Sequence, residues 1–298
     1  EAAKTALARG HQVTLFEKTD RVGGQLVAGG KMKIKHDVAK YLSNLQYQMD
    51  LLSKNGLEIK YNTFVKVEDL KGKYDVIICA NGLTPVIPEL EGKDLVRSVG
   101  ARELLLNGMK LPDDARKVTV IGGGVVGCEV AFSLAYEQGL EVTVVEMLPH
   151  LMTGTVHANR SMLLWMMMGK GAPSGRQEDV LQVPVKAFTS SKVVRFAKGK
   201  TFIMANRKRK DPYTPWTTLI PDNIHNPFDR PLNPKNVEEI AIDTDFVIYA
   251  TGGRADDLLY YELLKQKAAP EVYCIGDART PGRAWEAITS ANEVARFI

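Results

Sequence analysis

The sequence predicts an α/β fold with two Rossmann-like dinucleotide-binding domains. Two observations carry this prediction. The segment Lys117–Glu146 reads as a strand, a glycine-rich turn, a helix and a second strand that ends in an acid, which together make one complete βαβ unit. Residues 1–17 repeat the second half of that pattern, with a helix that ends at Gly10 and a strand that ends at Glu17.

The glycines of the complete unit have the spacing G-x-G-x-x-G, at Gly122, Gly124 and Gly127. Gly122 permits a tight turn after the strand, Gly124 lets a pyrophosphate approach the backbone, and Gly127 lets the helix pack closely on the strand. The helix opens near Val125, and its positive N-terminus favours phosphate groups. Glu146 lies about 20 residues further on, where a carboxylate can accept a hydrogen bond from a ribose 2′-OH. The pattern predicts a dinucleotide site; the alternative is an empty Rossmann unit whose glycines serve only packing.

The acid that ends the second strand also favours NADH over NADPH. A carboxylate at Glu146 would repel the 2′-phosphate of NADPH. The residues that follow it, Met147, Leu148 and Pro149, include no arginine to bind such a phosphate. We therefore expect NADH as the reductant.

The first dinucleotide-binding unit is incomplete in the sequence. The chain begins inside what we interpret as the first helix of a Rossmann unit. We therefore expect the preceding strand and glycine turn to be absent, the first sheet to lack its central strand, and the chain to be a fragment of a longer protein. The alternative is a helix and strand that bind no nucleotide, but the pair Gly23-Gly24 shortly after Glu17 makes that less favourable.

Five short segments, spread over nearly the whole chain, match motifs that occur together and in this order in one family. They are Phe16–Lys18 with Arg21–Leu26, Asn62–Val65, Tyr74–Gly82, Asp245–Gly252 and Val272–Asp277. In these segments the chain resembles the two-dinucleotide-binding flavoproteins. More narrowly, it resembles the C-terminal half of the 2,4-dienoyl-CoA reductase / 2-enoate reductase family of old-yellow-enzyme-like NADH:flavin oxidoreductases. Asn81 stands where that family usually has threonine.

The resemblance implies two cofactors, FAD in the first domain and NADH in the second. Asp277 would anchor the ribityl chain of the flavin, and the Val65 backbone would meet the adenine. A helix that starts at Pro281 would point its positive end at the flavin. The cofactor-binding candidates are Glu17, Lys18, Gly23, Gly24, Gln25, Val65, Ala80, Asn81, Gly82, Gly122, Gly124, Val125, Val126, Gly127, Glu146, Gly252, Gly276, Asp277, Ala287 and Ile288. No catalytic proton-transfer residue is predicted, because hydride transfer requires stacked rings more than acid–base groups.

The resemblance also implies partners. Members of the family join such a module to a barrel that carries FMN and a [4Fe-4S] cluster, which would precede residue 1. NADH would reduce FAD, and electrons would pass through cluster and FMN to the C=C bond of an enoate or enoyl-CoA. Two alternatives remain: an electron-transfer subunit of a bifurcating or glutamate-synthase-like assembly, and a non-catalytic nucleotide-sensing module. The expected partners are the barrel, in the same polypeptide or complex, a small-molecule substrate, and further copies of the chain in a homo-oligomer.

Bulk composition argues against several other classes. With 298 residues and 45% hydrophobic content, the chain can bury two ordinary cores. The formal net charge of +4 is spread along the chain and does not suggest nucleic acid. The run Arg207–Lys210 is interpreted as a solvated loop, or else as a patch for a partner domain or an anionic CoA-type substrate. No apolar run approaches the ~20 residues of a membrane span, and no signal peptide is visible.

The cysteines predict neither a redox dithiol nor a metal site. Cys79, Cys128 and Cys274 form no C-x-x-C motif, and the 5 histidines are scattered. Thioredoxin-reductase or disulfide-reductase chemistry is therefore not expected. This cysteine usage fits a reducing cytoplasm.

The order of the elements predicts a discontinuous first domain. Residues 1–110 and 251–298 are expected to form the FAD domain. Residues 111–250 are expected to form the NAD(P)H domain, with an insertion at about 169–182 and a loop at about 206–240. The further expected elements are strands at Val13–Glu17, Leu57–Tyr61, Val76–Cys79 and within Val183–Ser190, helices at Asp37–Asn55, Val99–Asn107 and His157–Met168, and hairpins in Lys192–Ala205 and Asp211–Asn236.

Overall fold

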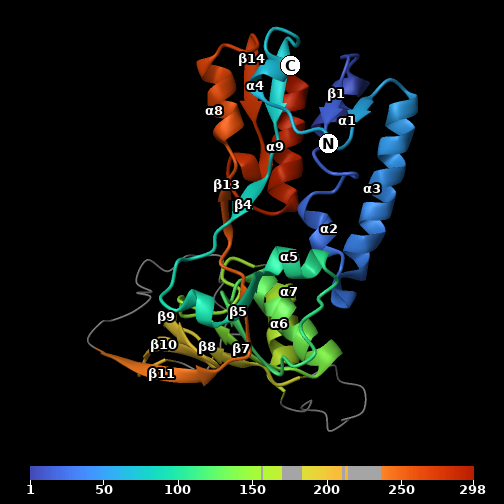
Figure 1. Cartoon of the computed structure of the whole chain (residues 1–298). Coiled ribbons are helices and arrows are strands. Elements are labelled where there is room, and N and C mark those ends of the chain that lie inside the picture. Colours follow the sequence, from blue (N-terminus) through green and yellow to red (C-terminus); the bar gives the residue numbers. More distant parts are fainter. Residues whose placement is uncertain (156, 170–182, 210–211, 214–235) are drawn as a thin grey trace. The chain divides into compact units, whose positions relative to one another are not determined.

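The computed structural model describes residues 1–155, 157–169, 183–209, 212–213 and 236–298, which form two compact units (Figure 1). Unit 1 comprises Glu1–Gly30, Lys35–Val86 and Gly253–Ile298, and unit 2 comprises Lys31–Ile34 and Ile87–Gly252. Apart from the short segment Lys31–Ile34, the chain passes from unit 1 to unit 2 after Val86 rather than near residue 110. The reason is β5 (Arg97–Gly100), which the sequence analysis did not predict and which pairs with a strand of unit 2.

Unit 2 is built on a parallel sheet of five strands in the order β5-β12-β6-β7-β8. The other strands are β12 (Phe246–Tyr249), β6 (Lys117–Ile121), β7 (Glu141–Val145) and β8 (Lys186–Phe188). Their central members are almost continuously apolar and buried, as expected of parallel strands that are covered on both faces.

Helices cover one face of this sheet and a second sheet covers the other. The helices of the unit are η2 (Lys93–Leu95), α5 (Ala101–Leu106), α6 (Val125–Gln138) and α7 (His157–Met167). The second sheet is antiparallel, with β9 (Ser191–Ala197), β10 (Lys200–Asn206) and β11 (Val237–Asp243) in the order β11-β10-β9. Ile121, Val145 and Val247 of the parallel sheet pack with Phe196 and Ile203 of the antiparallel sheet in one buried cluster.

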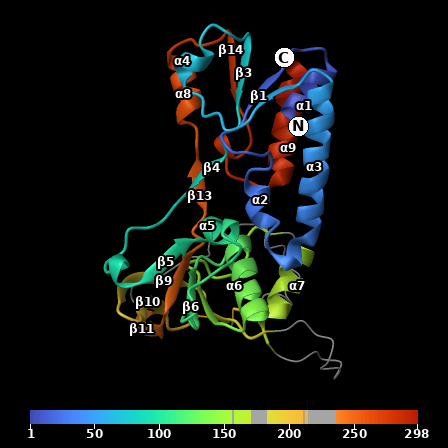
Figure 2. The ribbon, with the colours of Figure 1, turned by 45° about the vertical axis from the view of Figure 1, so that its right-hand side comes forward.

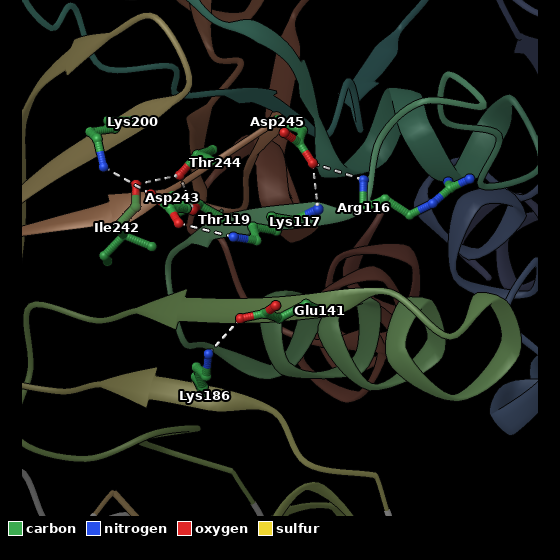
Figure 3. A network of polar contacts seen from close by, with 10 residues as sticks. All are labelled: Arg116, Lys117, Thr119, Glu141, Lys186, Lys200, Ile242, Asp243, Thr244 and Asp245. Carbon is green, nitrogen blue, oxygen red and sulfur yellow. Dashed lines mark hydrogen bonds and ion pairs between the residues drawn. The ribbon is translucent and has the colours of Figure 1, made fainter.

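A polar network secures the edge of unit 2 at which β6 begins (Figure 3). The carboxylate of Asp245 accepts the backbone N–H groups of Arg116 and Lys117 at 2.9 and 2.8 Å. Asp243 pairs with Lys117 and Lys200, both at 2.9 Å, and their hydrogen bonds lower its pKa to about 2. The network lies at the start of β6, whereas the glycine turn follows the end of that strand at Ile121.

Unit 1 contains three separate strand pairs rather than one sheet among its described residues. Two pairs are parallel, β1 (Thr14–Phe16) with β2 (Glu58–Lys60) and β3 (Val76–Cys79) with β14 (Glu271–Cys274). The third is antiparallel, β4 (Leu83–Pro85) with β13 (Gly253–Ala255). The helices are α1 (Ala2–Ala8), α2 (Gln25–Gly29), η1 (Lys33–Lys35, whose first two residues belong to unit 2), α3 (His36–Lys54), α4 (Val67–Leu70), α8 (Leu258–Lys265), η5 (Gly276–Ala278) and α9 (Ala284–Phe297).

Helix α1 lies beside α9, as Figure 2 shows. The Thr5 hydroxyl donates to the Asn292 side-chain carbonyl at 3.1 Å. The helix ends at Ala8, and Gly10, the predicted stop, has a left-handed φ of 94°. The N–H of Gly10 donates to the Leu7 carbonyl at 3.0 Å and that of His11 to the Ala6 carbonyl at 3.2 Å, which is the Schellman pattern.

Most of the predicted elements are confirmed within one or two residues, and two differ. The helix expected at Pro281 begins at Ala284, after Arg283 as N-cap. Residues 237–240 of the expected loop belong to β11, which pairs with β10. The rest of that loop, the hairpin predicted in Asp211–Asn236 and the insertion at about 169–182 lie almost entirely outside the described residues.

Candidate nucleotide-binding site

The glycine turn after β6 leaves no room for a side chain at its first and last positions. Gly122 has a φ of 106°, and a Cβ there would lie 2.3 Å from the Ala250 carbonyl oxygen. A Cβ on Gly127 would lie 1.9 Å from the Gly122 carbonyl oxygen. Both contacts are with backbone atoms that cannot move aside, so the turn requires glycine at both positions. This agrees with the tight-turn and close-packing roles expected from the sequence.

Gly124 differs from its two neighbours in the motif. A Cβ there would meet nothing within 4 Å, and the residue is exposed with an ordinary extended backbone. The fold of the chain itself therefore does not require glycine here. Gly124 is the N-cap of α6, so the unpaired N–H groups of the first turn, including those of Val125 and Val126, begin at this open surface. Such an end can bind an anion.

Glu146, directly after β7, is held against the same turn. Its carboxylate accepts the N–H of Gly123 at 2.6 Å and the N–H of Leu148 at 2.7 Å. A carboxylate has about four lone-pair positions, so these two bonds leave acceptor capacity for a ligand hydroxyl. The side chain is half-buried, which leaves part of it accessible.

Gly123 is a functional position that the motif analysis missed. A Cβ there would lie 2.5 Å from Cδ2 of Leu151 and 2.9 Å from Cβ of Glu146. Glycine at this position allows Glu146 to approach the turn and bond to it. The run of three glycines from Gly122 to Gly124 was the available signal, but the reason depends on Leu151, which only the tertiary structure brings there.

In unit 1, the acid that ends β1 is held in another way. Glu17 accepts the N–H and the hydroxyl of Thr19, both at 2.8 Å. Gly23 has a φ of 123° and faces the Leu42 side chain, while Gly24 has a φ of 50° and open space around it. Gln25 begins α2, and Lys18 is exposed.

A second group of candidates lies at the carboxyl ends of β3 and β14. Ala80, Asn81 and Gly82 follow β3, and Gly276 and Asp277 follow β14. Because the two strands are parallel neighbours, both segments leave the same edge, which is where ligands bind in α/β sheets. Asn81 is exposed, and Asp277 is half-buried and accepts the N–H of Gly282 at 2.9 Å.

The remaining candidates are more scattered. Val65 packs on the apolar cluster beneath β3, and Gly252, with a φ of 77°, precedes β13. Ala287 approaches Gly276 from α9, and Ile288 beside it is exposed. The structure thus groups most unit 2 candidates around one turn and most unit 1 candidates around the end of β1 and the ends of β3 and β14, whereas Gly252 of unit 2 follows β12.

None of the helices among the described residues is long and apolar enough to cross a membrane. The described residues also contain no group of three or more histidine, cysteine, aspartate or glutamate side chains that could hold a metal ion.

Comparisons with known proteins identify the family of the chain. Residues 1–292 match the family described as pyridine nucleotide-disulphide oxidoreductase. The chain is 30% identical over its whole length to cinnamate reductase of Clostridium sporogenes, of which it covers 37%. Half of it is 39% identical to an NADH oxidase of Thermoanaerobacter brockii, of which it covers 22%.

A solved structure shows the same fold over the whole chain. It is a 2-naphthoyl-CoA reductase in complex with 2-naphthoyl-CoA, with a TM-score of 0.73 and 26% identity, of which the chain covers 38%. The chain therefore spans about two fifths of the length of this protein and of cinnamate reductase. Fold class and family resemblance are confirmed: the protein belongs to the pyridine nucleotide-disulphide oxidoreductase family, whose members are flavoproteins that bind FAD and NAD(P)H.

Proposed function

We propose that the chain is an NADH-dependent flavin oxidoreductase module, in which unit 2 binds NADH and unit 1 binds FAD. One observation carries the NADH assignment. The glycine turn is closed to side chains at Gly122 and Gly127 but open at Gly124, beside the N-terminus of α6. A pyrophosphate needs this combination, because it must approach the backbone at the one position where the fold leaves space.

The choice of NADH over NADPH rests on Glu146. The N–H groups of Gly123 and Leu148 hold its carboxylate in place, so it cannot easily turn away from a 2′-phosphate. The two like charges would repel, and the cost rises in a partly buried site. A ribose 2′-OH would instead donate to the remaining acceptor positions.

The FAD assignment rests on two groups in unit 1. Glu17, Gly23, Gly24 and Gln25 would hold the ribose and pyrophosphate, and Asp277 would anchor the ribityl chain. When bound, FAD takes up a hydride from NADH and passes electrons to an acceptor. The chain would contribute binding and orientation: Gly282 holds Asp277, and the N-terminus of α9 would offer positive charge to the reduced ring. No side chain of this module needs to transfer a proton.

We propose further that the electrons reach a barrel with FMN and a [4Fe-4S] cluster, which reduces the C=C bond of an enoate or enoyl-CoA. Cinnamate reductase and 2-naphthoyl-CoA reductase, which are similar to this chain, support this substrate class by their names. A second candidate is the electron-transfer part of a different assembly. It is favoured by a 30% match over 157 residues to a glutamate synthase [NADH] of Saccharomyces cerevisiae.

The nucleotide assignment is tested with Gly124→Val. A branched side chain would occupy the space that the phosphate needs, whereas the protein itself has nothing within 4 Å of that position. NADH affinity should fall sharply while flavin content stays the same. An unaltered NADH titration in a folded variant would refute the assignment.

The substrate class is tested with the full-length gene product. NADH oxidation should accelerate when aryl-substituted 2-enoates or their CoA thioesters are added without oxygen. If NADH reduces the flavin but none of these compounds is consumed, the chain is better assigned to the electron-transfer part of a different assembly.

A further inference from the structure

The two strands that lead to the proposed flavin edge carry a pair of adjacent cysteines. Strands β3 and β14 are parallel, and Cys79 and Cys274 are partners in their register. Residues paired across parallel strands point to the same face, and neighbouring strands lie about 4.8 Å apart. This spacing falls within the Cα–Cα range of about 4.4–6.8 Å over which disulfides form. The two thiols are free in the structure.

Packing places both side chains on the same apolar cluster. Cys79 is buried there among Val67, Leu70 and Leu263, and Cys274 packs against the cluster while half-exposed. The motif analysis found no dithiol because no C-x-x-C motif is present. The pair arises instead from the pairing of two strands that are distant in sequence.

Burial in this apolar cluster raises the pKa values of both thiols. Burial, with a smaller contribution from the Cys274 thiolate, raises the pKa of Cys79 to about 12. Burial and the charge of Asp257 raise the pKa of Cys274, and Arg279 opposes them. The raised pKa values favour the protonated form of both thiols, so the exchange proceeds through the small thiolate fraction of each.

We propose that Cys79 and Cys274 form a reversible thiol–disulfide site that responds to low-molecular-weight disulfides. The more exposed Cys274 attacks one sulfur of such a disulfide as its thiolate, which releases one small thiol and leaves a mixed disulfide. The Cys79 sulfur then attacks Cys274 Sγ and releases the second small thiol. The two protein thiols lose two electrons and two protons, and the small disulfide gains them.

A disulfide between Cys79 and Cys274 would change the strand ends at which we place the flavin. Cys79 directly precedes Ala80, and Cys274 lies two residues before Gly276, so a bridge joins the strand ends from which both FAD segments start. A side-chain bridge draws Cβ atoms closer than parallel pairing does, and the two segments must shift. We expect faster release of FAD from the oxidised form. This consequence rests on the proposed function, whereas formation of the disulfide does not.

The test uses the full-length protein in buffers with different ratios of reduced to oxidised glutathione. Samples are quenched in acid, alkylated in denaturant and mapped by mass spectrometry without reduction. In oxidising buffer the Cys79 and Cys274 peptides should lose alkylation and appear as one linked peptide, and dithiothreitol should reverse this. Cys128, which is 0% exposed, is the internal control and should stay alkylated.

Two serine variants and a measurement of FAD release test the proposal further. Cys79→Ser and Cys274→Ser should each abolish the linked peptide. Full alkylation of both wild-type cysteines in the most oxidising buffer, or linkage of either one to Cys128 or to a second chain, would overturn the proposal. A linked peptide with unchanged FAD release would refute only the effect on flavin. A linked peptide in a protein that binds no FAD under any condition would count against the proposed function and leave the disulfide site standing.

Discussion

Units 1 and 2 both contain an apolar strand that ends in an acid, but they hold that acid differently. In unit 2, Glu146 is bonded to Gly123 within the glycine turn itself. In unit 1, Glu17 is bonded to Thr19, two residues further along the same loop. The same sequence pattern therefore gives a carboxylate bonded to the glycine turn in one unit, and a carboxylate bonded to its own loop in the other.

The packing around Glu146 is also tighter than the packing around Glu17. The strand before Glu146, β7, lies between β6 and β8 in a continuous five-stranded sheet and is nearly all buried, whereas β1 is half-buried and pairs with β2 alone among the described residues. A Cβ at Gly122 or Gly127 would strike backbone, but one at Gly23 would strike the movable end of Leu42. Packing thus constrains the glycine turn of unit 2 more tightly than the Gly23-Gly24 turn of unit 1.

The largest effect is expected from a single methyl group in the glycine turn of unit 2. Gly127→Ala puts a Cβ 1.9 Å from a backbone oxygen, and we expect a loss of about 3 kcal/mol or more in the free energy of unfolding. Gly124→Ala, the matched control, meets nothing and should change stability by less than about 1 kcal/mol. Denaturant titrations of both variants measure the difference. Equal stabilities would show that the turn is as adaptable as the one in unit 1.

A smaller effect is expected on nucleotide choice. Glu146→Ala removes the acceptor for the ribose and the charge that repels a 2′-phosphate. Hydrogen bonds to charged groups contribute about 1.5–3 kcal/mol, so kcat/KM for NADH should fall roughly tenfold or more. The ratio of NADH to NADPH activity should fall with it. A wild-type preference for NADPH, or an unchanged ratio in the variant, would contradict the assignment.

Core truncations compare the two sheets directly. Ile248, in the middle of the unit 2 sheet, is 0% exposed, whereas Ile78 in β3 of unit 1 is half-buried. Ile248→Val should cost about 1 kcal/mol and Ile78→Val clearly less. Urea denaturation of each variant provides the measurement. A larger loss from Ile78→Val would overturn the view that unit 2 has the tighter core.

The smallest expected effect is on the stability of the fold at low pH. Hydrogen bonds from Lys200 and Lys117 lower the pKa of Asp243 to about 2, below its ordinary value of 3.8. A depressed pKa stabilises the fold above the ordinary value, and this contribution disappears as the pH falls from about 3.8 towards 2. The residue is exposed, so the change should be small. Asp243→Asn should show a shallower fall in melting temperature between about pH 4 and pH 2 than the wild type, and an identical slope would refute the role of the pair.

The sequence predicted those parts of the fold and site that depend on local pattern. The unit from β6 to β7 has long apolar strands and regularly spaced glycines, so its elements and the role of Gly127 were predictable. Strand β5 was not predicted, because its first residues Arg97 and Ser98 are polar and exposed and its pairing with β12 is decided by distant residues. The role of Gly123 depends on Leu151 in the same way.

We propose that NADH bound by unit 2 reduces FAD bound by unit 1. This transfer is measured by rapid mixing of the full-length, FAD-loaded protein with NADH in the absence of oxygen, while the visible absorbance of the flavin is followed. We expect fast bleaching by NADH, much slower bleaching by NADPH, and loss of the fast phase in Gly124→Val at the same NADH concentration. Retention of FAD without bleaching by either nucleotide would refute the proposed transfer.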